Sequence, residues 1–344
     1  MASTMHALVK PTAAPGAELR NVAKPRPRAR EALVRVELAS ICGTDLHIYH
    51  WDEWASSRIQ PPLIFGHEFC GRVEEVGAET SFLKPGDRVS GEMHVACGQC
   101  MQCRTGDAHV CPSVRILGVD APGCFAEYVA VPESNLWQLS DSVTPEYAAI
   151  LDPLGNAVHT VMAGEVTGRS VAVIGCGPIG LMAIAVARAA GAGAIFALEP
   201  HAGRRAMARA MGADHLMPAA NPEIERQIQD LTPGRGVDVA LEFSGSVAGV
   251  QAALRLARPG GRVSLLGLPR KPIEIDLSPL VIFKGLTIQG INGRRMYDTW
   301  YQMEQLLGRL NLHPLITHRL PLADFAQAMQ LLENGEAAKI LLQP

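Results

Sequence analysis

Short stretches in which apolar and polar residues alternate make up most of the first third of the chain. Residues 5–10 read Met-His-Ala-Leu-Val-Lys and residues 31–38 read Glu-Ala-Leu-Val-Arg-Val-Glu-Leu, with turns rich in proline and glycine between them. Residues 71–77 and 123–131 continue the pattern. A period of two is typical of strands with one buried face. This part of the chain is therefore predicted to form a β-rich domain, a partly closed barrel.

The pattern changes near residue 170, where strands and helices begin to alternate. Val171–Ile174 is a continuous apolar strand, a glycine-rich turn and an alanine-rich helix follow to about Ala190, and Ala194–Leu198 is a second strand. Alternating strand and helix signals are typical of βαβ units, so the fold class is α/β with a doubly wound parallel sheet. Further signals of this kind lie at Arg204–Met211, Val237–Phe243, Val250–Leu256 and Arg262–Leu266.

The last fifty residues return to a looser pattern. A helix is expected over Met296–Leu307 and short strands over Ile316–Leu320 and Lys339–Leu342. We interpret this segment as returning to the first domain. A chain of 344 residues is long enough for two domains.

Composition and charge exclude several classes of function. The balance of 31 Lys and Arg against 34 Asp and Glu implies no polyanion-binding surface, and the basic run Lys24–Arg30 is interpreted as a solvated turn, so no nucleic-acid partner is expected. The apolar run Val171–Ala187 contains glycines and a proline and is too short to span a membrane, so no membrane partner is expected. The N-terminus has no apolar signal region. A cytoplasmic location is expected.

Gly175, Gly177 and Gly180 form a Gly-x-Gly-x-x-Gly motif between the apolar strand and the helix. Glu199 follows 19 residues after the last glycine, at the end of the next strand. This is the context that the dinucleotide-binding fingerprint requires. A carboxylate at this position accepts from ribose hydroxyls and repels a 2′-phosphate, so NAD is favoured. Arg204 and Arg205 leave NADP open, although an arginine there can also lie against the adenine.

Four of the eight cysteines lie close together in the first domain. In a chain without an export signal, this spacing favours a metal site over disulfides. Four thiolates form a closed tetrahedral site, which predicts a structural zinc. The alternatives are an iron–sulfur cluster, whose ferredoxin spacing differs, and two disulfides. The cluster consists of Cys97, Cys100, Cys103 and Cys111, whereas Cys70, Cys124 and Cys176 are expected to be small buried residues.

A second group of candidate ligands lies upstream of that cluster. Cys42 is followed by Thr44 and His47 in one short turn, and His67-Glu68 comes soon after. Cysteine, histidine and carboxylate are the ligands that a catalytic zinc takes, usually three with one position open. The role of Asp152 remains open: it could be a fourth ligand, a residue that holds a ligand in place, or a helix cap. His159 is expected to be a packed helix residue.

The order of these motifs resembles the zinc-dependent medium-chain alcohol dehydrogenase superfamily over essentially the whole chain. Five scattered segments resemble its L-threonine 3-dehydrogenase branch. These segments are His47–Trp54, Asp152–Thr160, Val281–Gly285, Gly293–Tyr301 and Ile316–Arg319.

The resemblance implies an architecture and a set of site residues. A GroES-like catalytic domain would comprise residues 1–153 and 297–344, with a zinc lobe at about 92–114, and a Rossmann NAD domain would comprise 154–296. Cys42, His67 and Glu68 would bind the catalytic zinc, Thr44 and His47 would form a proton relay, and Asp152 would complete or regulate the metal site. NAD would contact Gly175, Gly177, Ile179, Gly180, Glu199, Arg204, Leu266, Gly267, Leu268, Ile291 and Asn292.

The resemblance also implies a reaction and an assembly. L-threonine would be oxidised with NAD to 2-amino-3-ketobutyrate in threonine catabolism, by an enzyme that is commonly a homotetramer. A sister enzyme acting on sorbitol or a vicinal diol such as 2,3-butanediol would share every metal and NAD residue. A non-catalytic NAD-binding protein on the same scaffold would lack a ligand or relay residue, and this chain keeps them all.

Overall fold

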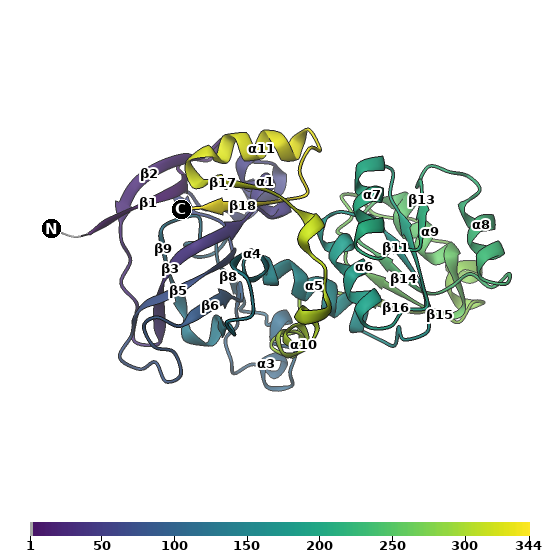
Figure 1. The fold of residues 1–344 in the computed structure, drawn as a ribbon, viewed down its shortest axis with the longest axis horizontal. Coiled ribbons are helices and arrows are strands. Elements are labelled where there is room, and N and C mark those ends of the chain that lie inside the picture. The colour runs from purple at the N-terminus through teal and green to yellow at the C-terminus, as the bar shows by residue number, and fades with distance from the viewer. Residues whose placement is uncertain (1–2) are drawn as a thin grey trace. The chain divides into compact units, whose positions relative to one another are not determined.

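The structure, a computed structural model, describes residues 3–344 and divides into two compact units. Unit 1 comprises the chain up to Asp152 together with Ile316–Pro344, and unit 2 is Pro153–Leu315 (Figure 1). No helix within residues 3–344 has both the length and the apolar character that a bilayer crossing requires.

Unit 1 is built on two sheets and a short hairpin. The largest sheet has seven strands, in the order β10-β6-β5-β3-β18-β17 with β9 also paired to β3. A smaller sheet has the order β2-β1-β4, and β7 pairs with β8. The strands are β1 (Thr4–Lys10), β2 (Glu18–Ala23), β3 (Glu31–Ser40), β4 (Leu63–Ile64), β5 (Glu68–Val76), β6 (Arg88–Gly91), β7 (His94–Val95), β8 (Arg115–Ile116), β9 (Tyr128–Pro132), β10 (Leu136–Gln138), β17 (Ile316–Pro321) and β18 (Lys339–Gln343).

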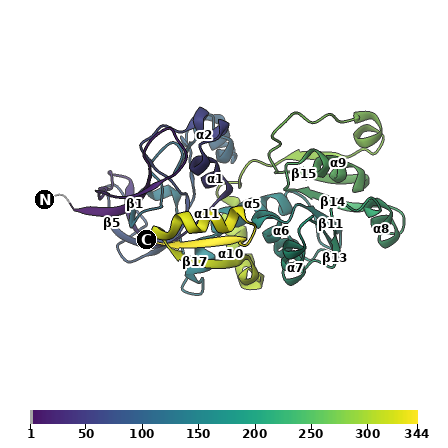
Figure 2. The ribbon, with the colours of Figure 1, turned by 90° about the horizontal axis from the view of Figure 1, so that it is seen from above.

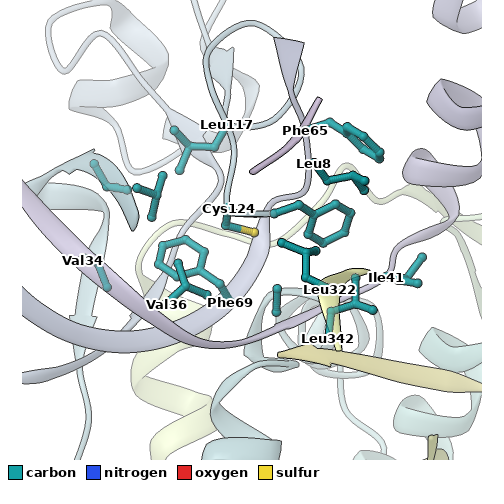
Figure 3. Close-up of a cluster of buried hydrophobic side chains, with 14 of the residues drawn as sticks. Leu8, Val34, Val36, Ile41, Phe65, Phe69, Leu117, Cys124, Leu322 and Leu342 are labelled. Carbon is teal, nitrogen blue, oxygen red and sulfur yellow. The ribbon is translucent and has the colours of Figure 1, made fainter. Parts of the chain in front are cut away.

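The core of unit 1 joins segments that are distant in sequence. The rings of Phe65, Phe125 and Phe325 lie with centroids 5.2 to 5.6 Å apart, two of the three pairs edge to face, as aromatic quadrupoles favour. Phe325 begins α11 (Phe325–Glu333). Leu322 and Leu342 also join this cluster (Figure 3). The final segment therefore belongs to unit 1, and β18 pairs antiparallel with β3.

The shorter helices of unit 1 lie in its connections. They are α1 (Gly43–His50), α2 (Glu53–Arg58), α3 (Met101–Arg104), η1 (Ala108–Val110), η2 (Glu133–Asn135), α4 (Pro145–Ala148) and η6 (Leu322–Asp324). α5 (Leu151–Met162) begins in unit 1 and continues into unit 2.

Unit 2 contains a six-stranded, wholly parallel sheet in the order β13-β12-β11-β14-β15-β16. Because crossovers between parallel strands are right-handed, α6 and α7 cover one face of the sheet and α8 and α9 the other. Figure 2 shows α9 on the opposite side of the strands from α6 and α7. The strands are β11 (Ser170–Ile174), β12 (Ala194–Leu198), β13 (His215–Met217), β14 (Val237–Glu242), β15 (Ala257–Leu265) and β16 (Thr287–Gly290).

The helices of unit 2 include the one expected after the glycine-rich turn. They are α6 (Pro178–Ala189), α7 (Ala202–Ala210), α8 (Ile224–Leu231), α9 (Val247–Leu256), the π-helical turn η3 (Ser278–Ile282), α10 (Asp298–Leu306), η4 (Leu307–Arg309) and η5 (His313–Leu315). The predicted α/β class, with a β-rich unit and a doubly wound sheet, is confirmed.

The sequence places the return to unit 1 at residue 297, whereas the compact division of the structure places it at Ile316. Residues 297–315 stay with unit 2 because η5 packs against α6 and α7, and Leu312 and Leu315 are fully buried.

Candidate active site and cofactor sites

Cys42 lies between β3 and α1, where it is the N-cap residue of the helix. Its backbone N–H donates to Oδ2 of Asp45 over 2.8 Å, and Asp45 is fully buried. A carboxylate three residues into a helix that accepts from the capping residue is half of a capping box. This contact fixes the backbone that carries the Cys42 thiol.

His67 and Glu68 lie where β5 begins, and glycine is required just before them. Gly66 has a φ of +84°, and a Cβ at this position would come within 2.4 Å of the Phe125 ring. Only glycine adopts this conformation and leaves that space free. Because of this turn, the side chains of His67 and Glu68 both lie in the interior of unit 1.

The two carboxylate oxygens of the fully buried Glu68 have different surroundings. Oε2 contacts the Lys339 ammonium and the Ser40 hydroxyl, whereas Oε1 has no hydrogen-bond partner within residues 3–344. Lys339 also donates to the Ile41 carbonyl over 2.7 Å. Sequence reasoning missed Lys339 and Ser40. The available signal for Lys339 is a lone charge at the start of the otherwise apolar strand β18.

Cys42, His67 and Glu68 place one ligand atom each within 4.8 Å of one another. Burial lowers the pKa of the His67 imidazole, but Cys42, and then the charges of Asp45 and Asp152, outweigh it and raise the pKa to about 10. A divalent cation would neutralise the same negative surroundings. His67 Nδ1 is also buried without a hydrogen-bond partner in the described chain. The donor set, with its unpartnered atoms on His67 and Glu68, fits a catalytic zinc, which would take the place of the proton on His67.

Asp152 lies in the first turn of α5, close to these ligands. Its side chain is buried, and its charge acts on both His67 and Cys124. In the part of the chain that the structure describes, its carboxylate is not in the group whose ligand atoms lie within 4.8 Å. This position suits a residue that acts on the metal ligands through its charge. Its role stays a prediction.

Thr44 and His47 both lie on α1. The Thr44 hydroxyl is 3.8 Å from the Cys42 sulfur. The His47 side chain is 42% exposed, its Nδ1 contacts the Asp52 carboxylate, and its ring centroid lies 5.9 Å from that of Trp54. A hydroxyl beside the thiol and an imidazole open to solvent are the two ends that a proton relay needs. The relay itself stays a prediction.

The four cysteines of the lobe converge on one point. Their sulfurs lie 3.4 Å apart for Cys100–Cys103, 3.8 Å for Cys100–Cys111 and 3.9 Å for Cys97–Cys103. Four sulfurs at about 2.3 Å from a tetrahedral zinc lie about 3.8 Å apart, whereas a disulfide joins its sulfurs at about 2.05 Å. Backbone N–H groups of Gln99 and Cys100 lower the pKa of the Cys97 thiol to about 6. The cluster therefore fits a structural zinc.

The other three cysteines, Cys70, Cys124 and Cys176, are buried, as predicted. Burial raises the pKa of each thiol above its ordinary value. They remain protonated and behave as small apolar side chains.

The glycine motif of unit 2 forms the turn between β11 and α6. Gly175 has a φ of +88°, and a Cβ on Gly180 would lie 2.0 Å from the Gly175 carbonyl oxygen. A Cβ on Gly177 would instead meet nothing within 4 Å. Gly175 and Gly180 are thus required by the fold, whereas Gly177 leaves open space at the N-terminus of α6. That space and the helix dipole suit a pyrophosphate.

Glu199 lies at the end of β12 and is almost fully buried. Its carboxylate accepts from the N–H groups of Cys176 and His201 over 2.9 and 3.0 Å, which leaves electron pairs for ribose hydroxyls. Arg205 donates to the Glu199 and Pro200 carbonyls. Arg204, in contrast, lines a pocket of about 530 Å³ together with the glycine turn and Glu199.

The remaining residues predicted to contact NAD lie at the ends of β15 and β16 or in the first turn of α6. The N–H groups of Leu266 and Gly267 donate to the Glu242 carbonyl, and that of Ile291 donates to the Leu265 carbonyl. Leu268 is 88% exposed and Asn292 is also exposed, while Ile179 is half-buried in α6. The structure therefore brings them to the same end of the sheet as Gly177.

Glu242 was missed by sequence reasoning. It is fully buried at the end of β14, and its side chain accepts from the Ser244 hydroxyl and from the N–H groups of Ser244 and Gly245. Burial raises its pKa. A polar residue ending an apolar strand is the signal that was available. It fixes the loop that contributes Ser244 to the pocket.

Two family models match the chain. Residues 28–141 match the alcohol dehydrogenase GroES-like domain, and residues 178–309 match the zinc-binding dehydrogenase. The chain is 48% identical to an L-threonine 3-dehydrogenase from Caldanaerobacter subterraneus subsp. tengcongensis over the whole of both chains. It is 47% identical to an L-threonine 3-dehydrogenase from Pyrococcus abyssi over 99% of each chain.

Solved structures share the fold. The 2R,3R-butanediol dehydrogenase from Bacillus subtilis is 29% identical, with a TM-score of 0.89 over 99% of each chain. An alcohol dehydrogenase from Escherichia coli CFT073, complexed with NADH, is 28% identical, with a TM-score of 0.90 over 99% of this chain and 100% of that one.

Proposed function

The chain belongs to the zinc-dependent medium-chain alcohol dehydrogenase family, and on that premise we propose that it is an L-threonine 3-dehydrogenase. The reaction converts L-threonine and NAD⁺ into 2-amino-3-ketobutyrate, NADH and a proton. The observation that carries the proposal is the group of half-buried Cys42 with buried His67 and Glu68, in which His67 Nδ1 and Glu68 Oε1 have no hydrogen-bond partner within residues 3–344, in a chain 48% identical along its full length to an enzyme with that activity.

We assign the metal and cofactor residues as follows. Cys42, His67 and Glu68 hold the catalytic zinc, and the four cysteines of the lobe hold the structural zinc. Gly177 and the α6 N-terminus receive the pyrophosphate, and Glu199 selects NAD through the ribose hydroxyls. When bound, the zinc supplies Lewis acidity that lowers the pKa of an alcohol, and NAD supplies the hydride acceptor.

The chain's own residues handle the proton and the charge. Beside Cys42, Thr44 accepts the substrate's hydroxyl proton while giving up its own toward His47, and His47 releases a proton to solvent from its exposed position. Lys339 and Ser40 hold one oxygen of Glu68 and thereby aim the other at the ligand group. Asp152 adjusts the charge around His67.

We further assign a homotetrameric state and a cytoplasmic location. Support for assembly comes from β16, the edge strand of the parallel sheet, which has β15 as its sole strand partner within residues 3–344. Ile288 of this strand is exposed, as are Ile282 and Phe283 in the segment that leads into it. A free strand edge with apolar neighbours is a surface that a second copy can cover. Eight unpaired cysteines agree with a reducing compartment.

The test is initial-rate NADH formation with L-threonine, sorbitol and 2,3-butanediol, before and after chelation and zinc re-addition. We expect catalytic efficiency with L-threonine to exceed that with the others by several orders of magnitude, to be lost on chelation and to return with zinc. Preference for a diol or polyol would replace the substrate assignment. Binding of NAD without turnover of any alcohol would indicate the non-catalytic alternative.

A further inference from the structure

Asp52 connects α1 to α2 through both of its carboxylate oxygens. Oδ1 accepts from the Ala55 N–H over 3.1 Å and so caps α2, while Oδ2 contacts Nδ1 of His47 in the last turn of α1. Between the two helices, Trp51 adopts a left-handed conformation with a φ of 57°. The chain reverses sharply at this residue, and the reversal brings Asp52 back to His47.

The ionisation of Asp52 determines the tautomer of His47. Burial raises the pKa of the Asp52 carboxyl, but the hydrogen bonds from His47 and the Ala55 N–H outweigh burial and hold the pKa below its ordinary value. Asp52 is therefore a carboxylate at neutral pH, and a carboxylate can only accept. Nδ1 of His47 must carry the hydrogen, so the lone pair of the neutral ring lies on Nε2.

We propose that Asp52 is a positioning residue for the proton relay, which holds His47 in the tautomer whose Nε2 accepts the substrate's proton. The inference rests on the proposed dehydrogenase function. The proton that Thr44 gives up bonds to Nε2, and the resulting imidazolium is balanced by Asp52 until the ring loses a proton to solvent. The Trp54 ring lies beside that of His47, tilted by 58° with the ring centroids 5.9 Å apart.

The other charged groups of these helices are engaged elsewhere or lie at the surface. His50 of α1 is bound to Glu333 of α11 over 2.8 Å, and Arg58 of α2 is bound to Asp120 over 2.7 Å. Asp45 is buried against the Cys42 N–H. Glu53, next to Asp52, is exposed at the first turn of α2. Asp52 is the carboxylate in contact with the His47 ring.

The test compares Asp52→Asn with Glu53→Gln. Both remove one negative charge from adjacent positions, and Asn keeps an oxygen that can cap α2. In the Asp52→Asn protein we expect the ¹⁵N spectrum of His47, assigned by its loss in His47→Gln, to show the hydrogen shared between Nδ1 and Nε2. In the wild type and Glu53→Gln it should remain on Nδ1.

Kinetics supply the second measurement. Asp52→Asn should lower kcat roughly ten- to hundredfold, a part of what general base catalysis contributes, and leave the KM for NAD within about twofold. The solvent isotope effect on kcat should rise as proton transfer becomes limiting.

An unchanged His47 spectrum in Asp52→Asn would overturn the proposal, as would a kcat loss matched by Glu53→Gln. The spectrum requires no substrate. A failure of the L-threonine assignment with a shifted His47 spectrum would therefore overturn the proposed function alone.

Discussion

Lys339 is one of the few ammonium groups in the chain that is almost completely withdrawn from water. It lies between the Glu68 carboxylate and the Ile41 carbonyl at the start of β18. A buried ion pair adds little to the stability of the fold compared with apolar side chains in its place. Loss of one partner, however, leaves the other charge buried without a counter-ion, which is strongly destabilising. The proposed metal ligand Glu68 thus depends on a residue about 270 positions away in sequence.

Replacement of Lys339 tests this dependence. Lys339→Met should lower the free energy of unfolding of the metal-free protein by about 3 kcal/mol, because Glu68 is left buried and unpaired. Urea denaturation measures the change. The double variant Lys339→Met/Glu68→Gln should regain most of the lost free energy of unfolding, since it no longer contains the unpaired charge of Glu68. Strictly additive effects of the two substitutions would contradict the coupling.

At the scale of elements, Gly177 and Gly180 of the same turn have different roles, one in binding NAD and one in the fold. Gly177→Ala should leave the melting temperature nearly unchanged, because its Cβ meets nothing within 4 Å, but should weaken NAD binding at least tenfold. Gly180→Ala should instead destabilise unit 2, because its Cβ would lie 2.0 Å from the Gly175 oxygen. Calorimetry with and without NAD separates the two effects. Equal melting losses in both variants would contradict this division.

The zinc lobe has almost no apolar core of its own. Between Cys97 and Cys111 it contains one turn of α3 and the short η1, and Met101 and Val110 are exposed. A segment of this kind takes its folding energy from the metal. Cys103→Ser should therefore unfold the lobe locally and leave the sheets intact.

Trypsin provides the measurement for the lobe. Cleavage after the exposed Arg104 should accelerate at least tenfold in Cys103→Ser or after chelation, while cleavage after Arg235 in unit 2 should not change. Mass spectrometry identifies both sites. Equal acceleration at Arg235 would indicate global rather than local unfolding.

Elements and chemistry were predictable where the signal is local. The alternation of strands and helices, the glycine turn with Glu199, and the cysteine spacing each lie within a few tens of residues, and the structure contains each of them. Ser40 and Lys339 were not predictable in this way, because their contact with Glu68 depends on the pairing of β3 with β5 and β18. The sequence marks Glu242 only as a polar residue at the end of an apolar strand; its role was not predictable, since most of its partners are backbone N–H groups.

At the scale of the whole molecule, the exposed apolar surface beside β16 is the feature to test. Phe283 is 82% exposed and lies in the segment that leads into the edge strand. Phe283→Ser should shift the assembly toward smaller species in analytical ultracentrifugation, because it removes apolar area from the proposed contact. Phe82→Ser, which changes an exposed phenylalanine of unit 1, should leave the assembly intact. An unchanged sedimentation coefficient in Phe283→Ser would contradict this interface.

The pairing of β18 with β3 across about 300 residues has a consequence for biosynthesis. The ribosome makes Cys42, His67 and Glu68 early, then the whole of unit 2, and only afterwards Lys339. Until then the nascent chain exposes a thiol, an imidazole and a carboxylate that lacks its counter-ion, next to a sheet that lacks two strands. Unit 2 can fold during translation, whereas unit 1 must wait. We therefore expect a metal to enter the group of Cys42, His67 and Glu68 only after translation is complete.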